Sequence, residues 1–261
     1  MRVGIYAEAA AELAAIAGTN AMRYYRTVLD AETKTDGSPV TVADKSSELV
    51  VREWIERRFP SDGILGEEFG VYNAGARRRW IIDPIDGTKA FIRGVPFWGS
   101  LVAVVEGETV IAGAASFPAL GETLVAGQGE GCWWNGAKCS VSTIDTMSRA
   151  TVLTTDVAFR NEESKRKGWL ALVELAANSR TWGDCVGYLL VATGRAEVMA
   201  DPIVSAWDVA ALLPAIVEAG GVFTDWEGNI TAFGTSAVAT NGALAAEVRA
   251  VLGQSARDGT P

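Results

Sequence analysis

The sequence contains no histidine, and this absence excludes several classes of enzyme. Without histidine the chain has no Ser-His or Cys-His nucleophilic pair, no phosphohistidine chemistry and no imidazole-ligated zinc or iron. It also lacks a cysteine followed six positions later by arginine, because those positions hold Lys138, Asp145 and Val191. A tyrosine-phosphatase-like site is therefore excluded. Chemistry has to come from carboxylates, hydroxyls, backbone groups and metal ions.

Cysteines are few, and long apolar runs are absent. The three cysteines, Cys132, Cys139 and Cys185, have a spacing that fits no zinc site, so we expect free buried thiols in a reducing compartment. No apolar run approaches the length of a membrane span, and Glu8 and Glu12 interrupt the alanine-rich N-terminal stretch. We therefore expect a cytoplasmic protein with no signal peptide and no membrane partner.

Basic residues are fewer than acidic residues. The chain has 23 Lys and Arg against 32 Asp and Glu, a formal net charge of −9. A chain of this charge repels polyanions, so we expect no nucleic-acid partner, and a site that handles phosphate would need local cations. With 261 residues, 49% of them hydrophobic, the chain can build a sizeable core in one large or two medium domains.

The first part of the chain reads as two helices and a mostly antiparallel sheet. Apolar spacing predicts helices over residues 5–29 and 46–59. A buried strand runs through residues 80–82, and the apolar run over residues 95–107 predicts a central strand. The turn Asn135-Gly136 is typical of a two-residue hairpin.

After about residue 146 strands and helices alternate, which indicates an α/β layer. The predicted helices of this part cover residues 162–178, 185–193, 207–219 and 242–252, and a frayed tail is expected over residues 255–261. The expected fold class is thus α/β with an α+β N-terminal part. We divide the chain into an N-terminal half, 1–145, and a C-terminal half, 146–261.

Four acidic stretches lie at strand ends, helix starts or loops, where ligands can converge. They are Asp83-Pro84-Ile85-Asp86-Gly87-Thr88, Gly66-Glu67-Glu68-Phe69, Ala206-Trp207-Asp208-Val209-Ala210 and Thr41-Val42-Ala43-Asp44. Each also has a purely structural interpretation. Asp44, Asp86 and Asp208 could cap helices. Asp83 could belong to a surface ion pair, and Glu67 with Glu68 could form a solvated turn.

The first of these stretches combines carboxylates with free backbone donors. Gly87 allows a tight turn, and Thr88 begins a helical turn whose first amides point outward as anion donors. Asp83 and Asp86 beside such donors suit a metal ion bridged to a phosphate. They stand three positions apart, not two, so the spacing does not support an aspartyl-phosphate route. Since only oxygen ligands are available, Mg²⁺ or Mn²⁺ is favoured over Zn²⁺.

Two long segments resemble the signatures of the inositol monophosphatase family, the lithium-sensitive sugar phosphatases. They are "WIIDPIDGTKAF" at 80–91 and "WDVAALLPAIVEAGG" at 207–221, with "GEE" and "SPVTVAD" upstream in the family's order. The resemblance covers about residues 34–242. It implies a layered α-β-α-β-α sandwich with a mostly antiparallel sheet and a second, C-terminal α/β sheet. It also implies a homodimer that hydrolyses a small phosphomonoester.

The resemblance assigns the acidic residues to metal ions. It implies that Glu67, Asp83, the Ile85 carbonyl, Asp86 and Asp208 bind two or three Mg²⁺ ions, for which Mn²⁺ can substitute. Asp83 would bridge two ions, and Asp208 would lie beside the leaving group. The N-terminal half would then carry most of the ligands, and the C-terminal half would carry Asp208.

The remaining matched positions would handle the phosphate and the attacking water. Gly87 and Thr88 match the family's phosphate-binding amides. Thr88 and Asp44 match the pair that orients the water, which is activated by metal at Glu67. Glu68 matches the acid next to that water. No protein nucleophile is required, which accounts for phosphatase chemistry without histidine.

Two segments narrow the implied substrate. "GTKAFIRG" replaces the commoner Gly-Thr-x-Asn-Phe pattern, and "GDCVGY" places Asp184 where inositol-type members carry a small or hydroxyl residue. Both resemble the family's histidinol-phosphate phosphatases, whose substrate carries an ammonium and an imidazole group. Asp184 and Asp201 occupy positions that face the substrate in the family. Asp184 could instead cap a helix, and Lys89 and Arg93 could steer phosphate or form surface ion pairs.

Three functions therefore stay open at this point. The first is a Mg²⁺-dependent histidinol-phosphate phosphatase of histidine biosynthesis. The second is an inositol-phosphate or sugar-phosphate phosphatase with the same chemistry. The third is a non-catalytic relative that binds protein or RNA, and this function predicts eroded metal ligands.

Overall fold

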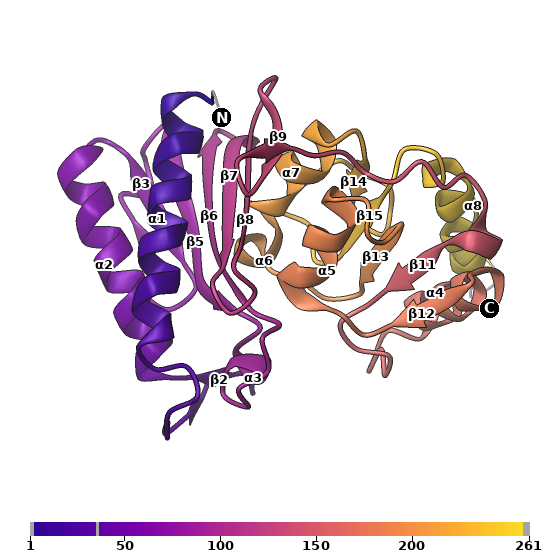
Figure 1. Cartoon of the computed structure of the whole chain (residues 1–261), viewed down its shortest axis with the longest axis horizontal. Helices are drawn as coiled ribbons and strands as arrows, with labels where there is room; N and C mark the ends of the chain where they lie inside the picture. Colours follow the sequence, from indigo (N-terminus) through magenta and orange to yellow (C-terminus); the bar gives the residue numbers. More distant parts are fainter. Residues whose placement is uncertain (1–2, 35–36, 258–261) are drawn as a thin grey trace.

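The computed structural model describes residues 3–34 and 37–257, and it has five alternating layers of helices and sheets (Figure 1). The outer helices α1 (Ile5–Met22) and α2 (Val42–Arg58) cover one face of an eight-stranded sheet. The middle layer contains α5 (Asp184–Ala192), α6 (Ala206–Val209) and α7 (Leu212–Glu218). A five-stranded sheet follows, and α4 (Glu163–Leu175) and α8 (Ala245–Arg257) cover its far side. The expected α-β-α-β-α sandwich is confirmed.

The large sheet has the strand order β10-β9-β8-β7-β6-β5-β3-β4. All of its pairs are antiparallel except β3 with β5, as expected for a mostly antiparallel sheet. Its strands are β3 (Gly63–Gly66), β4 (Gly70–Tyr72), β5 (Arg78–Asp86), β6 (Gly99–Glu106), β7 (Thr109–Phe117), β8 (Glu122–Gly127), β9 (Gly131–Trp134) and β10 (Ala137–Lys138). The hairpin expected at Asn135-Gly136 joins β9 to β10.

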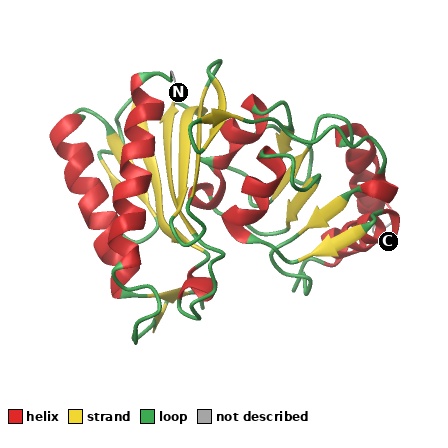
Figure 2. Cartoon of the chain, viewed as in Figure 1, coloured by secondary structure: helices red, strands yellow, loops and turns green. Residues whose placement is uncertain are grey.

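The small sheet has the order β12-β11-β13-β15-β14, with parallel pairing of β11 to β12 and to β13. Its strands are β11 (Thr151–Leu153), β12 (Asn178–Arg180), β13 (Val198–Asp201), β14 (Val222–Thr224) and β15 (Ala237–Thr240). The short elements are β1 (Glu32–Thr33), β2 (Pro39–Val40), α3 (Thr88–Phe91) and the 3₁₀ turn Met147–Arg149. Figure 2 separates the helical layers from the strand layers.

Three apolar clusters fill the spaces between the layers. Ala10, Leu13 and Trp80 belong to the cluster between the outer helices and the large sheet. A second cluster lies between that sheet and the middle helices, and a third beneath α4 and α8. Strand β5 supplies buried side chains to the first two clusters from its opposite faces, so the acidic end of this strand is rigidly anchored. None of the described helices is long and apolar enough to cross a bilayer.

Several helix boundaries differ from the expected ones. Helix α1 ends at Met22, because the chain turns over the next residues and Arg26 adopts a φ of 61°. Helix α2 begins four residues earlier than expected, at Val42, because Thr41 and Asp44 form a capping box there.

The helix expected over 207–219 is two helices, α6 and α7. Pro214 has no N–H to donate to the carbonyl of Ala210, so the helical ladder is interrupted between them. Helix α4 ends before residue 178, where β12 begins. Helix α8 extends to Arg257, so the frayed tail expected from 255 begins as helix, and its last part, 258–261, lies outside the described residues.

Candidate active site

Strand β5 brings Asp83 and Asp86 to the edge of the large sheet. The pairing of β5 with β6 shifts register between these two residues, so the strand is irregular where the acids lie. The irregularity is fixed by hydrogen bonds: Ser100 Oγ donates to the Pro84 carbonyl over 2.7 Å, and the Ile85 N–H donates to Asp83 Oδ1 over 3.0 Å. The two acids are 2% and 8% exposed.

Asp208 reaches the same place from the C-terminal half. It is the third residue of α6, and its Oδ2 accepts the N–H of Ser205 over 2.7 Å in a capping box. Carboxylate oxygens of Asp83, Asp86 and Asp208 lie within 4.8 Å of one another. The structure therefore brings together three of the four carboxylates expected to bind metal, and Asp208 caps a helix at the same time.

Each of these carboxylates makes ionisation of the others less favourable, and this raises their pKa values. Burial raises the pKa of Asp83 well above its ordinary value, and the charges of Glu67, Asp86 and Asp208 raise it further. Burial likewise raises the pKa of Asp86, and it raises that of Asp208 to about 7. Buried acids this close to one another require positive charge to be ionised together. The donor set, all oxygen and strongly negative, fits a hard divalent cation.

Glu67 and Glu68 both form ion pairs with Lys34, a residue that was not predicted from the sequence to belong to the site. Lys34 Nζ lies 2.7 Å from one carboxylate oxygen of each. Burial lowers the pKa of Lys34, but its hydrogen bonds to the two glutamates outweigh that effect and the pKa is raised. Burial raises the pKa of Glu68 to about 7. Lys34 belongs to none of the four acidic stretches and to no matched motif, so the sequence carried no signal for it.

Helix α2 fixes the loop that carries the two glutamates. The fully buried carboxylate of Glu48 accepts the N–H of Glu68 over 2.7 Å and that of Phe69 over 3.2 Å. Arg52 Nε donates to the same carboxylate over 2.6 Å. A Cβ on Gly66 would lie 1.9 Å from Glu48 Oε1, so only glycine fits there. Glu48 was not identified from the sequence, because an acid in a helix is usually exposed.

The expected partners Asp44 and Thr88 are in contact. Thr88 Oγ1 lies 3.2 Å from Asp44 Oδ1 and 2.9 Å from the Ile85 carbonyl. The other oxygen of Asp44 accepts from the N–H and hydroxyl of Thr41, and burial raises the pKa of Asp44. Gly87 caps α3 with a φ of 87°, and a Cβ there would lie 2.7 Å from the Phe97 carbonyl. As cap and first residue, Gly87 and Thr88 have amides without acceptors inside the helix.

Asp184 begins α5 in a backbone conformation that is unusual for a residue with a side chain, with a φ of 48°. Its N–H donates to Thr155 Oγ1 over 2.8 Å, and the next amide, of Cys185, donates to Asp86 Oδ2. Burial raises the pKa of Asp184 to about 6, while the exposed Lys89 lowers it. The alternative of a helix cap is wrong, because Gly183 is the cap residue and the first amides of α5 donate to Thr155 and Asp86, not to Asp184.

Asp201 is linked to Asp184 through Thr155, which hydrogen-bonds to both residues. Its carboxylate is 4% exposed, and it accepts the N–H of Thr155 over 2.9 Å and the hydroxyl of Tyr188 over 3.1 Å. Burial raises its pKa to about 7. Asp201 thus reaches the site through Thr155, and neither Thr155 nor Tyr188 was predicted as a site residue. The exposed Arg93 lies just beyond α3.

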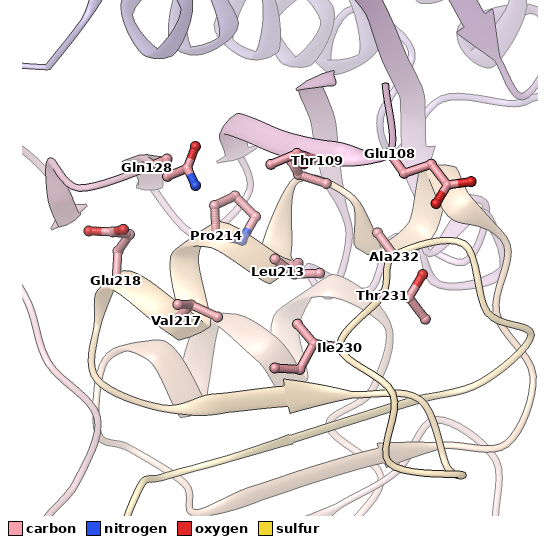
Figure 3. A pocket seen from close by; sticks show the side chains of 11 residues that line it. Glu108, Thr109, Gln128, Leu213, Pro214, Val217, Glu218, Ile230, Thr231 and Ala232 are labelled. Atoms are coloured by element: carbon pink, nitrogen blue, oxygen red, sulfur yellow. The ribbon is translucent and has the colours of Figure 1, made fainter. Parts of the chain in front are cut away.

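A separate cavity of about 280 Å³ lies between the large sheet and α7 (Figure 3). Its lining shares no residue with the acidic cluster. Glu218, at one end, accepts the amides of Gly129 and Gly131 over 2.7 and 2.8 Å. This contact ties α7 to the β8–β9 turn, so the cavity belongs to the packing between layers and the chemistry belongs to the acidic cluster.

The five-layered fold and the convergence of carboxylates from the large sheet and from helix α6 of the middle layer define a metal-dependent phosphatase. The family model of the inositol monophosphatase family matches residues 5–257, and the chain belongs to this family. It is a hydrolase that acts on a small phosphomonoester.

Relatives and solved structures agree with this assignment. The chain is 42% identical to a histidinol-phosphatase of Chlorobaculum parvum over 95% of this chain and 97% of the relative. It is 41% identical to a histidinol-phosphatase of Mycobacterium tuberculosis, over 83% and 85%. An inositol monophosphatase structure from Thermotoga maritima superposes with a TM-score of 0.85 at 31% identity, over 95% of this chain and 96% of that one.

Proposed function

We propose that the protein hydrolyses L-histidinol phosphate to L-histidinol and phosphate in histidine biosynthesis, with Mg²⁺ as its cofactor. The observation that carries this proposal is Asp184, an additional acid beside the acidic cluster in a strained backbone conformation. Its charge is among the causes that raise the pKa of Asp86, so the two acids are close. Backbone strain of this kind persists where the surrounding structure holds it, as Thr155 does here.

The chemistry of the substrate explains why an acid is needed there. Histidinol phosphate carries an ammonium and an imidazole group in addition to its phosphate, whereas an inositol ring carries no cation. A partly buried carboxylate gains from a cationic partner and is costly without one. The similarity of 41–42% to two histidinol-phosphatases, over most of the chain, supports the same substrate.

We infer that Glu67, Asp83, the Ile85 carbonyl, Asp86 and Asp208 hold two or three Mg²⁺ ions, with Mn²⁺ as a substitute. When bound, such ions neutralise phosphoryl oxygens and make water a better nucleophile at neutral pH. The raised pKa values of Asp83 and Asp208 support the inference, because they reflect the burial of these carboxylates and then their closeness to other negative charges.

The chain's own groups would place the phosphate and the water. The amides of Gly87 and Thr88 would donate to phosphoryl oxygens. The Thr88 hydroxyl, which donates to Asp44, can accept a hydrogen bond from the attacking water and pass a proton toward that carboxylate. Glu68, held beside Glu67 by Lys34, would orient the same water.

The decisive measurement is kcat/KM on histidinol phosphate and on inositol 1-phosphate with Mg²⁺. A clear preference for histidinol phosphate supports the proposal, and a clear preference for inositol 1-phosphate overturns the assigned substrate. Activity that persists in excess EDTA would contradict the metal assignment.

An inositol or sugar phosphate is the second candidate substrate. It is supported by the 32% identity, over 82% of both chains, to a fructose-1,6-bisphosphatase/inositol-1-monophosphatase of Thermotoga maritima. A non-catalytic protein- or RNA-binding role has little support, because Glu67, Asp83, Asp86, Thr88 and Asp208 are all present.

We also propose a cytoplasmic homodimer whose chains divide near residue 145. Three cysteines without a disulfide support a reducing location, and the two sheets take their strands from residues 63–138 and 151–240. Light scattering tests the oligomeric state: twice the chain mass supports the homodimer, and the mass of one chain overturns it.

A further inference from the structure

Two of the three cysteines face each other across the β9–β10 hairpin. Trp134 pairs with Ala137 and Trp133 with Lys138, so the next opposed pair is Cys132 and Cys139. The N–H of Cys139 donates to the Cys132 carbonyl over 3.0 Å, which extends the ladder by one step. Directly opposed residues of a hydrogen-bonded antiparallel pair have Cα atoms about 5.5 Å apart, within the range that a disulfide spans.

The two side chains lie on the same face of the hairpin, against the apolar cluster between the large sheet and the middle helices. Each thiol is among the causes that shift the pKa of the other, so the two sulfurs are close. Cys132 is buried and Cys139 is half-buried, so one sulfur is accessible to a small oxidant and the other is sheltered behind it.

The surroundings distinguish the two sulfurs chemically. The hydrogen bond from Cys132 lowers the pKa of Cys139, and the positive charge of Arg195 lowers it further. Arg195 is fixed there by Glu122, 2.6 Å away, and by the ring of Trp134. The pKa of Cys132 is raised by the same hydrogen bond and by burial. Cys139 therefore loses its proton more readily than Cys132, and the thiolate is the reactive form of a cysteine.

We propose that Cys132 and Cys139 form a reversible disulfide when the protein meets a hydroperoxide. The Cys139 thiolate attacks the peroxide, the O–O bond breaks, and a sulfenic acid forms with release of water or an alcohol. The Cys132 sulfur then attacks the sulfenic sulfur, the S–O bond breaks, and water leaves as the S–S bond forms. In total, two thiols and one hydroperoxide give one disulfide, one alcohol or water molecule, and one water molecule.

The disulfide closes a short ring at the edge of the large sheet. It links the end of the two-residue strand β10 covalently to β9. The chain after β10 continues directly into the connection toward the small sheet. No residue of this hairpin belongs to the acidic cluster. The bond therefore acts on the stability of the edge, and it protects Cys139 from further, irreversible oxidation.

The sequence makes the test direct. Lys138 lies between the two cysteines, so trypsin places them on different peptides, 94–138 and 139–149, and only a disulfide keeps these joined. The full-length protein is treated with hydrogen peroxide, its remaining thiols are alkylated, and it is unfolded and digested without reductant. We expect the joined peptides, a loss of two hydrogens from the intact mass, complete reversal by dithiothreitol, and a melting temperature a few degrees higher.

Cys185 is an internal control in the same digest. It is fully buried and its pKa is raised well above the ordinary value by burial, so it should be found alkylated. The half-buried Cys139→Ser variant should fold and give no joined peptides, and Cys132→Ser should leave Cys139 as a sulfinic acid. The proposal is overturned if peroxide leaves both cysteines alkylated, converts Cys139 to a sulfinic acid in the wild type, or links two chains.

Discussion

Replacement of Asp208 by asparagine should stabilise the metal-free protein while it abolishes activity. Burial raises the pKa of Asp208 from 3.8 to about 7, and the charges of Glu67 and Asp201 add to this effect. Asparagine retains an oxygen for the N–H of Ser205, which lies 2.7 Å from Asp208 Oδ2, but it carries no charge. The substitution therefore removes both the cost of burying a charge and the repulsion from neighbouring acids, and it leaves the helix cap intact.

The size of the effect follows from the pKa shift and depends on pH. A carboxyl whose pKa is raised on folding favours the folded state below its unfolded pKa, and this contribution is lost as the pH rises through its folded pKa. A shift from 3.8 to about 7 corresponds to about 4 kcal/mol at pH 8 and less than about 1 kcal/mol at pH 4. In EDTA, Asp208→Asn should exceed the wild type in free energy of unfolding by this order of magnitude at pH 8, and nearly equal it at pH 4.

Urea unfolding followed by tryptophan fluorescence at both pH values measures this difference. The exposed Asp30→Asn variant is the matched control, and it should show no pH-dependent gain. Added Mg²⁺ should stabilise the wild type more than Asp208→Asn, which reverses their order at pH 8. If Asp208→Asn is the less stable protein at pH 8 in EDTA, the acidic cluster is not under electrostatic repulsion and the argument for a metal site loses its main support.

Four further outcomes are expected. Asp83→Asn should lower kcat by at least about 100-fold with an unchanged circular dichroism spectrum, and near-normal turnover would refute a bridging role. Asp184→Asn should reduce kcat/KM on histidinol phosphate far more than on inositol 1-phosphate; equal losses would show that Asp184 serves the fold alone. Gly87→Ala should lower the free energy of unfolding by about 1–3 kcal/mol, since it combines a φ of 87° with a Cβ 2.7 Å from the Phe97 carbonyl, and an unchanged urea midpoint would contradict that strain. Glu48→Gln should weaken the Mg²⁺ dependence of activity by loosening the Glu68 loop, seen as a higher Mg²⁺ concentration at half-maximal rate, whereas an unchanged Mg²⁺ dependence would deny Glu48 this role.

The layered fold could be predicted because the apolar pattern of each segment is enough to distinguish its helices from its strands. Apolar periodicity marks the outer helices, and the continuous apolar run before Asp83 marks a strand buried on both faces. The acids at the end of that strand stood out because buried strands rarely end in carboxylates. Asp208 was found by its resemblance to a family signature, and the structure places it beside Asp83 and Asp86.

Other features depend on contacts between residues far apart in the chain. Lys34, directly after β1, pairs with Glu67 and Glu68 more than 30 positions further along the chain, and nothing in its own sequence neighbourhood marks it as a site residue. Thr155, two residues after β11, contacts Asp184 at the start of α5, 29 positions later in the chain. Pro214 removes an N–H, and this indicates a break in the helical stretch. A single helix was predicted because the apolar periodicity continues through the break between α6 and α7.

The acidic cluster takes Asp83 and Asp86 from one sheet and Asp208 from the layer beyond it, which has a consequence for the order of events during synthesis. Asp208 leaves the ribosome well over a hundred residues after Asp86. Until then the emerging chain contains only part of the proposed metal-binding set, and no fragment that ends before α6 can hold all of the acidic cluster. If Asp208 binds metal as proposed, activity arises late in synthesis, and we expect a chain truncated before α6 to be inert toward phosphate esters.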